Sequence, residues 1–182
     1  MSQIEKSRPA EKGKMVIFTA AAAPSLEETG MMDAPIFTEE GANEEVASGD
    51  FAERSMEGSR LTVPFQQAGP DGFSLVDIEF APGFLLPRHS HSSDCLYYIV
   101  AGSLVMGQRE LGPGDGFFLP AEQPYAYRAG PEGVKLLEFR HRACFDMKIY
   151  EKDMARYRAK AEASLAEASS GGAASEGAGR GA

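Results

Sequence analysis

The chain has 182 residues and a formal net charge of −9, with hydrophobic residues making up 43% of the sequence. This length fits one domain better than two, and the hydrophobic share is enough to form a core. Because an acidic chain repels phosphate backbones and anionic lipids, we expect no nucleic-acid partner and no docking on a membrane surface. No stretch approaches the ~20 apolar residues that cross a bilayer.

The first part of the chain, residues 1–45, mixes Ala, Glu, Pro and Gly without a steady period. We interpret it as a loosely ordered leader with one short strand at Met15–Thr19. Basic residues ahead of an apolar stretch are a feature of signal peptides, but Glu5 and Glu11 interrupt the basic part and the stretch is short and Ala-rich. A cytoplasmic protein is therefore the favoured prediction.

The two cysteines, Cys95 and Cys144, lie far apart and form no CxxC pattern. Neither a disulfide framework nor a zinc ribbon is indicated by this spacing. Free thiols are the favoured interpretation, and one bridge between the two is the alternative.

Residues 46–145 contain short segments with β-strand character, separated by turns rich in Gly and Pro. Such spacing is typical of a sandwich or barrel, and no helical pattern separates the segments as a parallel α/β sheet would require. The expected strands are 59–66, 73–80, 96–100, 104–108, 116–119, 125–128 and 134–140.

The pattern changes after this region. Residues 146–168 carry apolar side chains mostly three or four positions apart, with Glu, Lys and Arg between them, which predicts one amphipathic helix capped by Asp146. We expect it to pack on the outside of the barrel or on a second subunit. Residues 169–182 are almost all Ala, Ser, Gly and Glu, so we expect a disordered tail.

The chain has three histidines, and two of them, His89 and His91, stand two positions apart. Residues i and i+2 of a strand point to the same face, so the two imidazoles can converge on one point, as a metal ion requires. Taken alone, this pair fits a metal site and two unrelated strand histidines equally well.

The surroundings of this pair resemble the two sequence motifs of the cupin superfamily. Gly83, five residues, His89-x-His91, three residues, Cys95, six residues and Gly102 follow the first motif, and Gly114, five residues and Pro120 follow the start of the second. The resemblance covers roughly residues 59–142. It implies an all-β, cupin-type double-stranded β-helix (jelly-roll) barrel, here with a C-terminal α-helix.

Carried over residue by residue, the resemblance implies four metal ligands, two of them changed from the family pattern. The two histidines are kept, the family's Glu position holds Cys95, and its second-motif His position holds Tyr125. The second motif's Gly and Asn are also replaced, by Glu122 and Ala129. The implied cofactor is a divalent transition metal (Fe, Zn, Cu, Ni or Mn), and a thiolate and phenolate would favour Zn or Cu.

Each of these positions also has a simpler interpretation. Cys95 fits a small buried residue of the barrel, and Tyr125 fits a pocket wall or a hydrogen-bond donor. Tyr97 and Tyr127 share parity with these two residues, so all four side chains are candidates for the barrel interior. A Cys at the Glu position also occurs in thiol dioxygenases, but those proteins keep the second-motif His that this chain lacks.

Other polar residues offer further ligands or contacts. Asp94 offers a carboxylate if the strand bulges, and His141 offers a third imidazole, although a structural role is favoured for it. Glu138 and Arg140 on the closing strand are interpreted as a salt bridge on the solvated surface.

The favoured function is a metal-binding cupin acting on a small organic molecule, either a dioxygenase-like oxidoreductase or a lyase or isomerase. Tyr125 and Tyr127 are the predicted catalytic residues, because a phenol beside a cation can exchange a proton. The alternative is a non-catalytic small-molecule-binding module with a degenerate metal site, and a storage role ranks third. The family resemblance further implies a homodimer.

Overall fold

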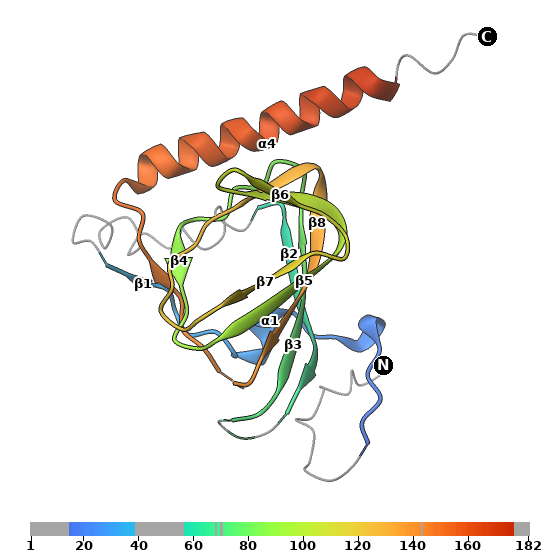
Figure 1. Ribbon diagram of the computed structural model, residues 1–182, viewed down its shortest axis with the longest axis vertical. Helices are drawn as coiled ribbons and strands as arrows, with labels where there is room; N and C mark the ends of the chain where they lie inside the picture. The colour runs from blue at the N-terminus through green and yellow to red at the C-terminus, as the bar shows by residue number, and fades with distance from the viewer. Residues whose placement is uncertain (1–14, 39–56, 68, 70, 143, 177–182) are drawn as a thin grey trace, which may run out of the picture.

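The computed structural model describes residues 15–38, 57–67, 69, 71–142 and 144–176. These residues form a β-barrel with one long helix lying across it (Figure 1). The strands are β1 (Ile36–Phe37), β2 (Ser59–Gln66), β3 (Ser74–Phe80), β4 (His89–Ser90), β5 (Cys95–Met106), β6 (Arg109–Leu111), β7 (Gly116–Leu119), β8 (Arg128–Arg140) and β9 (Lys148–Ile149). The helices are η1 (Ala20–Ala22), α1 (Leu26–Thr29) and α4 (Met154–Glu176).

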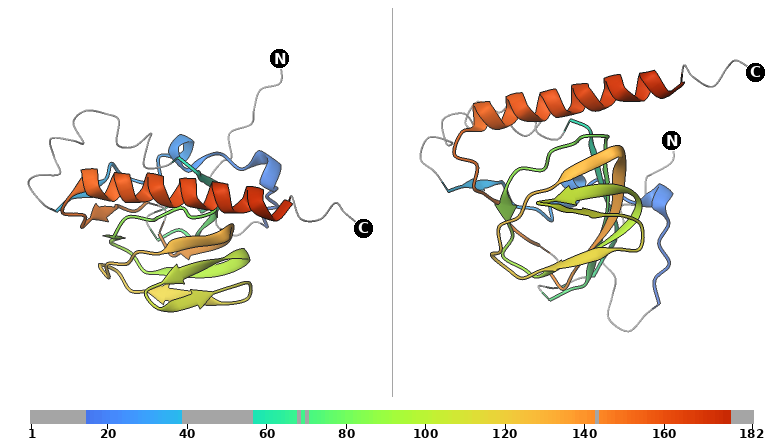
Figure 2. Two further views of the ribbon diagram at one scale, coloured as in Figure 1. Left: turned by 90° about the horizontal axis from the view of Figure 1, so that it is seen from above. Right: turned by 45° about the horizontal axis from the view of Figure 1, so that its top comes forward.

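The described strands form two sheets that curl around one interior (Figure 2). The larger sheet has the order β2-β3-β8-β5-β6, with β7 also paired to β5, and the smaller one has the order β1-β9-β4. All pairs in the larger sheet are antiparallel, whereas β1 runs parallel to β9. The all-β jelly-roll barrel with a C-terminal helix is therefore confirmed.

Alternation along the strands builds the core. In β3, every second residue from Ser74 to Phe80 is buried, and β5 repeats this pattern at its start. The inward apolar side chains from both strands and from β8 form one cluster, in which Leu136 is fully buried. Each large apolar side chain buried this way contributes about 1.5–3 kcal/mol to stability.

Two predicted turns are instead bulges within long strands. The segment at 96–100 and residues 104–106 of the segment at 104–108 belong to β5. Most of the segment at 125–128 precedes β8, which includes residues 130–133, where a turn was expected. At the bulge, Gly102 has φ +68°, and a Cβ there would lie 2.1 Å from the carbonyl oxygen of Gly133. Glycine at this position lets β5 and β8 approach closely, so that the chain continues along β5 instead of turning back.

Part of the predicted leader packs on the barrel. The short helix α1 begins with a capping box between Ser25 and Glu28, and Leu26 and Met31 then bury themselves against Val63. The predicted strand at residues 15–19 is absent, and residues 1–14 and 39–45 of the predicted leader lie outside the described residues. The barrel residues against which this segment packs were not predictable from the local sequence.

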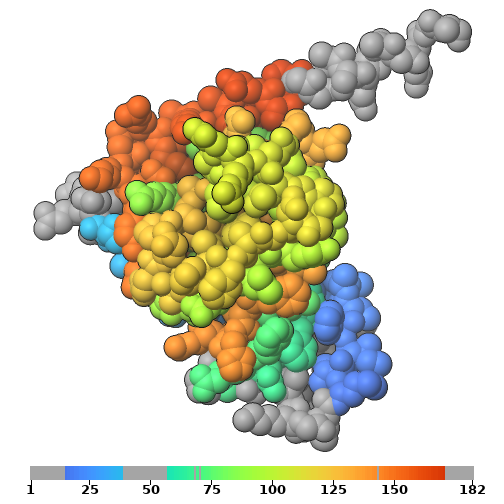
Figure 3. All heavy atoms as spheres, viewed as in Figure 1, coloured from blue at the N-terminus to red at the C-terminus, as the bar shows by residue number. Residues whose placement is uncertain are grey.

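Helix α4 begins at Met154, later than predicted, because its cap is Asp153, whose carboxylate accepts from the amide of Arg156 (2.8 Å). It remains helical to Glu176 and so extends into the region for which a disordered tail is expected, and the rest of that region lies outside the described residues. The Tyr157 hydroxyl donates to the carbonyl of Leu85 (2.6 Å), and Figure 3 shows the helix resting on the barrel. Within the described residues, no helix has the length and apolar character to cross a membrane.

Candidate active site

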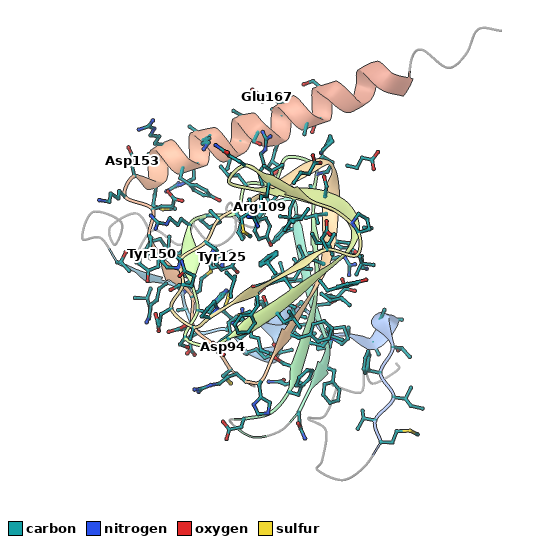
Figure 4. The ribbon with its side chains drawn as sticks, in the orientation of Figure 1. Asp94, Arg109, Tyr125, Tyr150, Asp153 and Glu167 are labelled. Carbon is teal, nitrogen blue, oxygen red and sulfur yellow. The ribbon has the colours of Figure 1, made fainter. Side chains whose placement is uncertain are left out.

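The two motifs face each other across a short bridge in the backbone. The amide of His89 donates to the carbonyl of Tyr125 (3.0 Å), and the amide of Tyr125 donates back to the carbonyl of His89 (2.9 Å). Their rings lie 4.3 Å apart, and Figure 4 labels Tyr125 within the barrel. Tyr125, which holds the histidine position of the second motif, therefore lies beside the His89 and His91 pair of the first motif.

Both histidines have their Nδ1 atoms engaged by main-chain carbonyls. Nδ1 of His89 lies 2.8 Å from the carbonyl oxygen of Pro87, and Nδ1 of His91 lies 2.6 Å from that of Asp146. Since a carbonyl oxygen only accepts, each Nδ1 carries the hydrogen and each Nε2 keeps its lone pair. The imidazole rings lie 4.8 Å apart, so the pair is held as two ready ligands or proton acceptors.

The buried environment keeps both imidazoles neutral at pH 7. Burial lowers the pKa of His89 to about 3, with the neighbouring His91 adding to the effect. Burial also lowers the pKa of His91 to about 4, helped by the positive charge of Arg140. Neutral imidazole is the form that binds metals and accepts protons.

Two tyrosine hydroxyls form a hydrogen-bonded chain that ends at His91. The hydroxyl of Tyr97 lies 2.7 Å from that of Tyr125, which lies 3.4 Å from Nε2 of His91. Because Nε2 accepts, Tyr125 donates to it and receives the hydrogen bond of Tyr97. Burial raises the pKa of both phenols well above the usual value of 10, so both carry their protons.

The pair Glu138 and Arg140 is buried, which corrects the expectation of a solvated surface pair. Glu138 and Arg140 are 5% and 1% exposed, because they share the inward parity of Leu136 on β8. Arg140 Nε donates to the Glu138 carboxylate, and its guanidinium lies 3.9 Å above the Phe145 ring. Burial alone would raise the pKa of Glu138, but the charge and hydrogen bond of Arg140 outweigh it and lower the pKa.

These residues line a cavity of about 160 Å³ inside the barrel. Its polar groups are His89, His91, Tyr97, Tyr125, Tyr127, Glu138 and Arg140. The remaining lining is apolar: Leu26, Met32, Pro35, Leu61, Val76, Ile78, Phe80, Phe84, Leu86, Pro87, Phe145, Met147 and Ile149. A mostly apolar hollow with a few polar groups is typical of a small-molecule site.

The other predicted site residues take different places. Tyr127 is buried and lines the cavity, as does Tyr97. Cys95 is buried but is not part of the cavity lining, and its thiol donates to the carbonyl of Ser93 (3.3 Å). Burial raises the pKa of Cys95 to about 12, and Cys95 and Cys144 are both free thiols.

Neither of the two further candidate ligands faces the cavity. The Asp94 carboxylate accepts from the amide of Ala121 (2.8 Å), and His141 is exposed. Within the part of the chain that the structure describes, no three His, Cys, Asp or Glu side chains cluster so as to hold a metal ion.

The residue at the glycine position of the second motif retains the glycine-like backbone. Glu122 has φ 64°, and its amide donates to the carbonyl of His91 (2.7 Å). Its carboxylate pairs with Lys148 at 2.8 Å. The loop thus keeps its shape and ties the second motif to the first, at the cost of a left-handed conformation on a non-glycine residue.

Sequence reasoning missed the roles of Arg140, Phe145 and Asp146 in this site. The strand parity that placed Glu138 and Arg140 on one face was readable, but charged residues are seldom fully buried, so burial was not the expected outcome. The carbonyl of Asp146 that holds His91 carries no side-chain signal.

No family model matches the chain, and no curated protein matches it. Among solved structures, it is similar to the DMSP lyase DddQ from Ruegeria pomeroyi DSS-3, at 27% identity and a TM-score of 0.41 over 47% of each chain. It is also similar to KdgF from Halomonas sp., at 25% identity and a TM-score of 0.40 over 47% of this chain and 81% of that one.

A third similar structure is a protein of unknown function with a cupin-like fold from Ralstonia eutropha JMP134. It is 14% identical, with a TM-score of 0.45 over 72% of this chain and 69% of that one. The chain thus spans about half of the DMSP lyase, at 47%, and more of the other two. The barrel topology and the spacing of the two motifs agree with the cupin-type fold that the sequence resemblance implies.

Proposed function

We propose that this chain is a metal-dependent cupin enzyme that transfers a proton on a small organic molecule held in the cavity. The observation that carries the proposal is the hydroxyl chain from Tyr97 through Tyr125 to Nε2 of His91, with His89 beside it. Proton donors and acceptors in hydrogen-bond reach of one another are the elements of general acid–base catalysis.

The cavity sets the size of the molecule. At about 160 Å³, it is close to the ~150 Å³ apolar cavity known to hold benzene, which fits a molecule of about six to ten heavy atoms. Its apolar lining, with side chains such as Val76, Ile78 and Phe80, suits a hydrocarbon body.

The donor set fits a transition metal through three side chains. A bound ion would take the Nε2 lone pair of His89 and, in place of the hydrogen bond from the Tyr125 hydroxyl at 3.4 Å, the Nε2 lone pair of His91. Imidazole and phenolate suit Fe, Zn, Cu, Ni or Mn, and a bound ion would polarise a substrate oxygen as a Lewis acid. Cys95 is less suited to the set, because its thiol points to a carbonyl and keeps its proton.

The tyrosines then have separate roles. Tyr125, in contact with His91, donates or accepts the transferred proton, and Tyr97 behind it replaces that proton through its hydrogen bond. Tyr127 lines the cavity with its ring 6.2 Å from that of Tyr125 and positions the bound molecule. This arrangement favours lyase or isomerase chemistry over dioxygenation, since what it supplies is protons.

Elemental analysis of untagged protein tests the metal. We expect near-stoichiometric transition metal in the native protein and loss of it in a His89→Ala, His91→Ala double variant. The matched control is His141→Ala, which removes an exposed imidazole and leaves the metal content unchanged. If the native protein contains no metal after Fe, Mn, Ni, Cu and Zn have been supplied in turn, the metalloenzyme proposal is refuted.

Tyr125→Phe tests the third donor and the proton relay together. If the phenol binds the ion, the dissociation constant for the metal rises by about tenfold, or about 1.4 kcal/mol. Tyr97→Phe, which removes the hydroxyl behind it, leaves the metal affinity unchanged and serves as the control. Equal metal affinity in all three proteins would remove Tyr125 from the ligand set.

The second candidate is a non-catalytic binding module. The observation that favours it is that, among the described residues, no third His, Cys, Asp or Glu is placed to hold a metal ion together with His89 and His91. In that case the cavity would bind its molecule without metal, and the elemental analysis above separates the two candidates.

We propose a homodimer as the assembly. The outer face of β5 exposes Leu96, Tyr98 and Val100 in alternation, and Phe118 of β7 pairs directly with Leu96. An apolar patch of this kind can pair with its own copy across a two-fold axis. Sedimentation velocity is expected to show a dimer that Leu96→Glu dissociates, and a monomeric native protein would refute this assembly.

A further inference from the structure

One buried donor in the cavity wall has no partner. Nη2 of Arg140 makes no hydrogen bond to any described residue, although Arg140 is 1% exposed and lines the cavity. A buried charged group with an unsatisfied donor is unfavourable, and native proteins rarely keep one without a reason.

The other contacts of Arg140 hold its guanidinium in place. Nε donates to Glu138, Nη1 donates to the hydroxyl of Ser93 (3.2 Å), and one face lies against the Phe145 ring. Because the guanidinium is planar and held on three sides, Nη2 cannot turn to another partner without breaking these contacts. A hydrogen-bond acceptor for Nη2 must therefore be supplied by a molecule bound in the cavity.

The cavity already determines most of the partner's character. The same hollow that Arg140 lines has an apolar wall that includes Val76, Ile78 and Phe80. Its histidines and tyrosines are neutral, and Glu138 compensates the guanidinium charge. Because the cavity has no net charge to spare, recognition depends on the directed, charge-assisted hydrogen bond from Nη2 of Arg140.

We propose that the cavity binds small monocarboxylic acids, with a carboxylate oxygen accepting from Nη2 of Arg140 and the apolar body lying along Val76 and Ile78. This inference rests on the cavity of the proposed function and names its substrate class. A carboxylate is the acceptor of choice because hydrogen bonds between a guanidinium and a carboxylate are about twice as strong as neutral ones.

Calorimetric titration of the full chain with two molecules of similar shape tests this class. The probes are hexanoate and hexanamide, which differ in whether the acceptor group is charged. We expect the native protein to bind hexanoate at least about tenfold more tightly than hexanamide. Equal affinity for the two probes would overturn the proposal.

Two variants assign the preference to Arg140. Arg140→Lys keeps a charge next to Glu138 but loses Nη2, and the Glu138→Gln, Arg140→Gln double variant removes both charges together. In each, hexanoate is expected to bind at least about tenfold more weakly, while hexanamide changes by less than about threefold. Arg60→Gln, at an exposed cation, is the matched control and leaves both affinities unchanged.

Thermal unfolding of each variant shows whether it is folded before it is titrated. Equal losses for hexanoate and hexanamide in a folded variant would overturn the proposal. Repeating the titrations after removal of metal with a chelator separates this proposal from the preceding one. Hexanoate binding that survives chelation and still depends on Arg140 supports the carboxylate site even where the metal proposal fails.

Discussion

The buried pair of Glu138 and Arg140 gives the sharpest stability prediction. Glu138→Gln keeps the shape of the side chain and removes its charge, which leaves the guanidinium of Arg140 in the barrel without a counter-ion. The Arg140 and Glu138 side chains are 0% and 6% exposed, so water cannot take the place of the lost charge. Removing one partner of a buried pair costs about 3–5 kcal/mol.

The expected loss is large enough to measure by heating. For a chain of this size, 1 kcal/mol shifts the midpoint of thermal unfolding by about 2–4 °C, so Glu138→Gln should lower it by about 6–20 °C. The same change at Glu79, which is 38% exposed and pairs with Arg60 and Lys135, should cost less than about 1 kcal/mol.

The pH dependence follows from the direction of the pKa. Because the pKa of Glu138 is lowered in the folded protein, its charged form stabilises the fold above its ordinary value of 4.5, and this stabilisation is lost as the pH falls through the folded pKa. The stability gap between native protein and Glu138→Gln should therefore be full at pH 7 and narrow below about pH 4.5.

Urea unfolding at pH 7 and at pH 3.5, followed by tyrosine fluorescence, measures both effects. A Glu138→Gln variant as stable as the Glu79→Gln control would refute the reasoning, because the guanidinium would then have another way to satisfy its charge. A gap that stays constant with pH would refute the assignment of the lowered pKa to Glu138.

Three further predictions concern the core, the helix and the thiols. Leu136→Ala, at a fully buried side chain, should cost about 2–5 kcal/mol in urea unfolding, and a loss below 1 kcal/mol would mean that the core collapses around the gap. Tyr157→Phe removes the hydroxyl that donates to the carbonyl of Leu85 and should cost about 1 kcal/mol, which amide exchange in α4 would report as faster opening. Cys144 should react with a thiol reagent at pH 8, whereas Cys95, buried and with its pKa raised to about 12, should react only on unfolding; two fast thiols would contradict the placement of Cys95.

The barrel and the neighbourhood of the site can be predicted from local sequence patterns. Alternating strands with Gly and Pro turns predict an all-β fold, because side chains alternate in a strand wherever it is folded. The spacing of the two motifs brought His89 and Tyr125 to one place, as the backbone bridge between them shows. These features depend on local pattern and on the order of residues along the chain.

Which side chains face the cavity, and which contacts hold them there, depends on how distant segments pack together. Whether Gly102 begins a turn or a bulge depends on how closely the partner strand at Gly133 approaches, which no local pattern records. Likewise, the sequence pattern predicts Arg140 at the surface, whereas contacts with Phe145 and Glu138 bury it. The orientation of His91 depends on a hydrogen bond to the carbonyl of Asp146, 55 positions away in the chain. Burial and hydrogen bonding are properties of contacts between distant segments, so they arise only once the barrel closes.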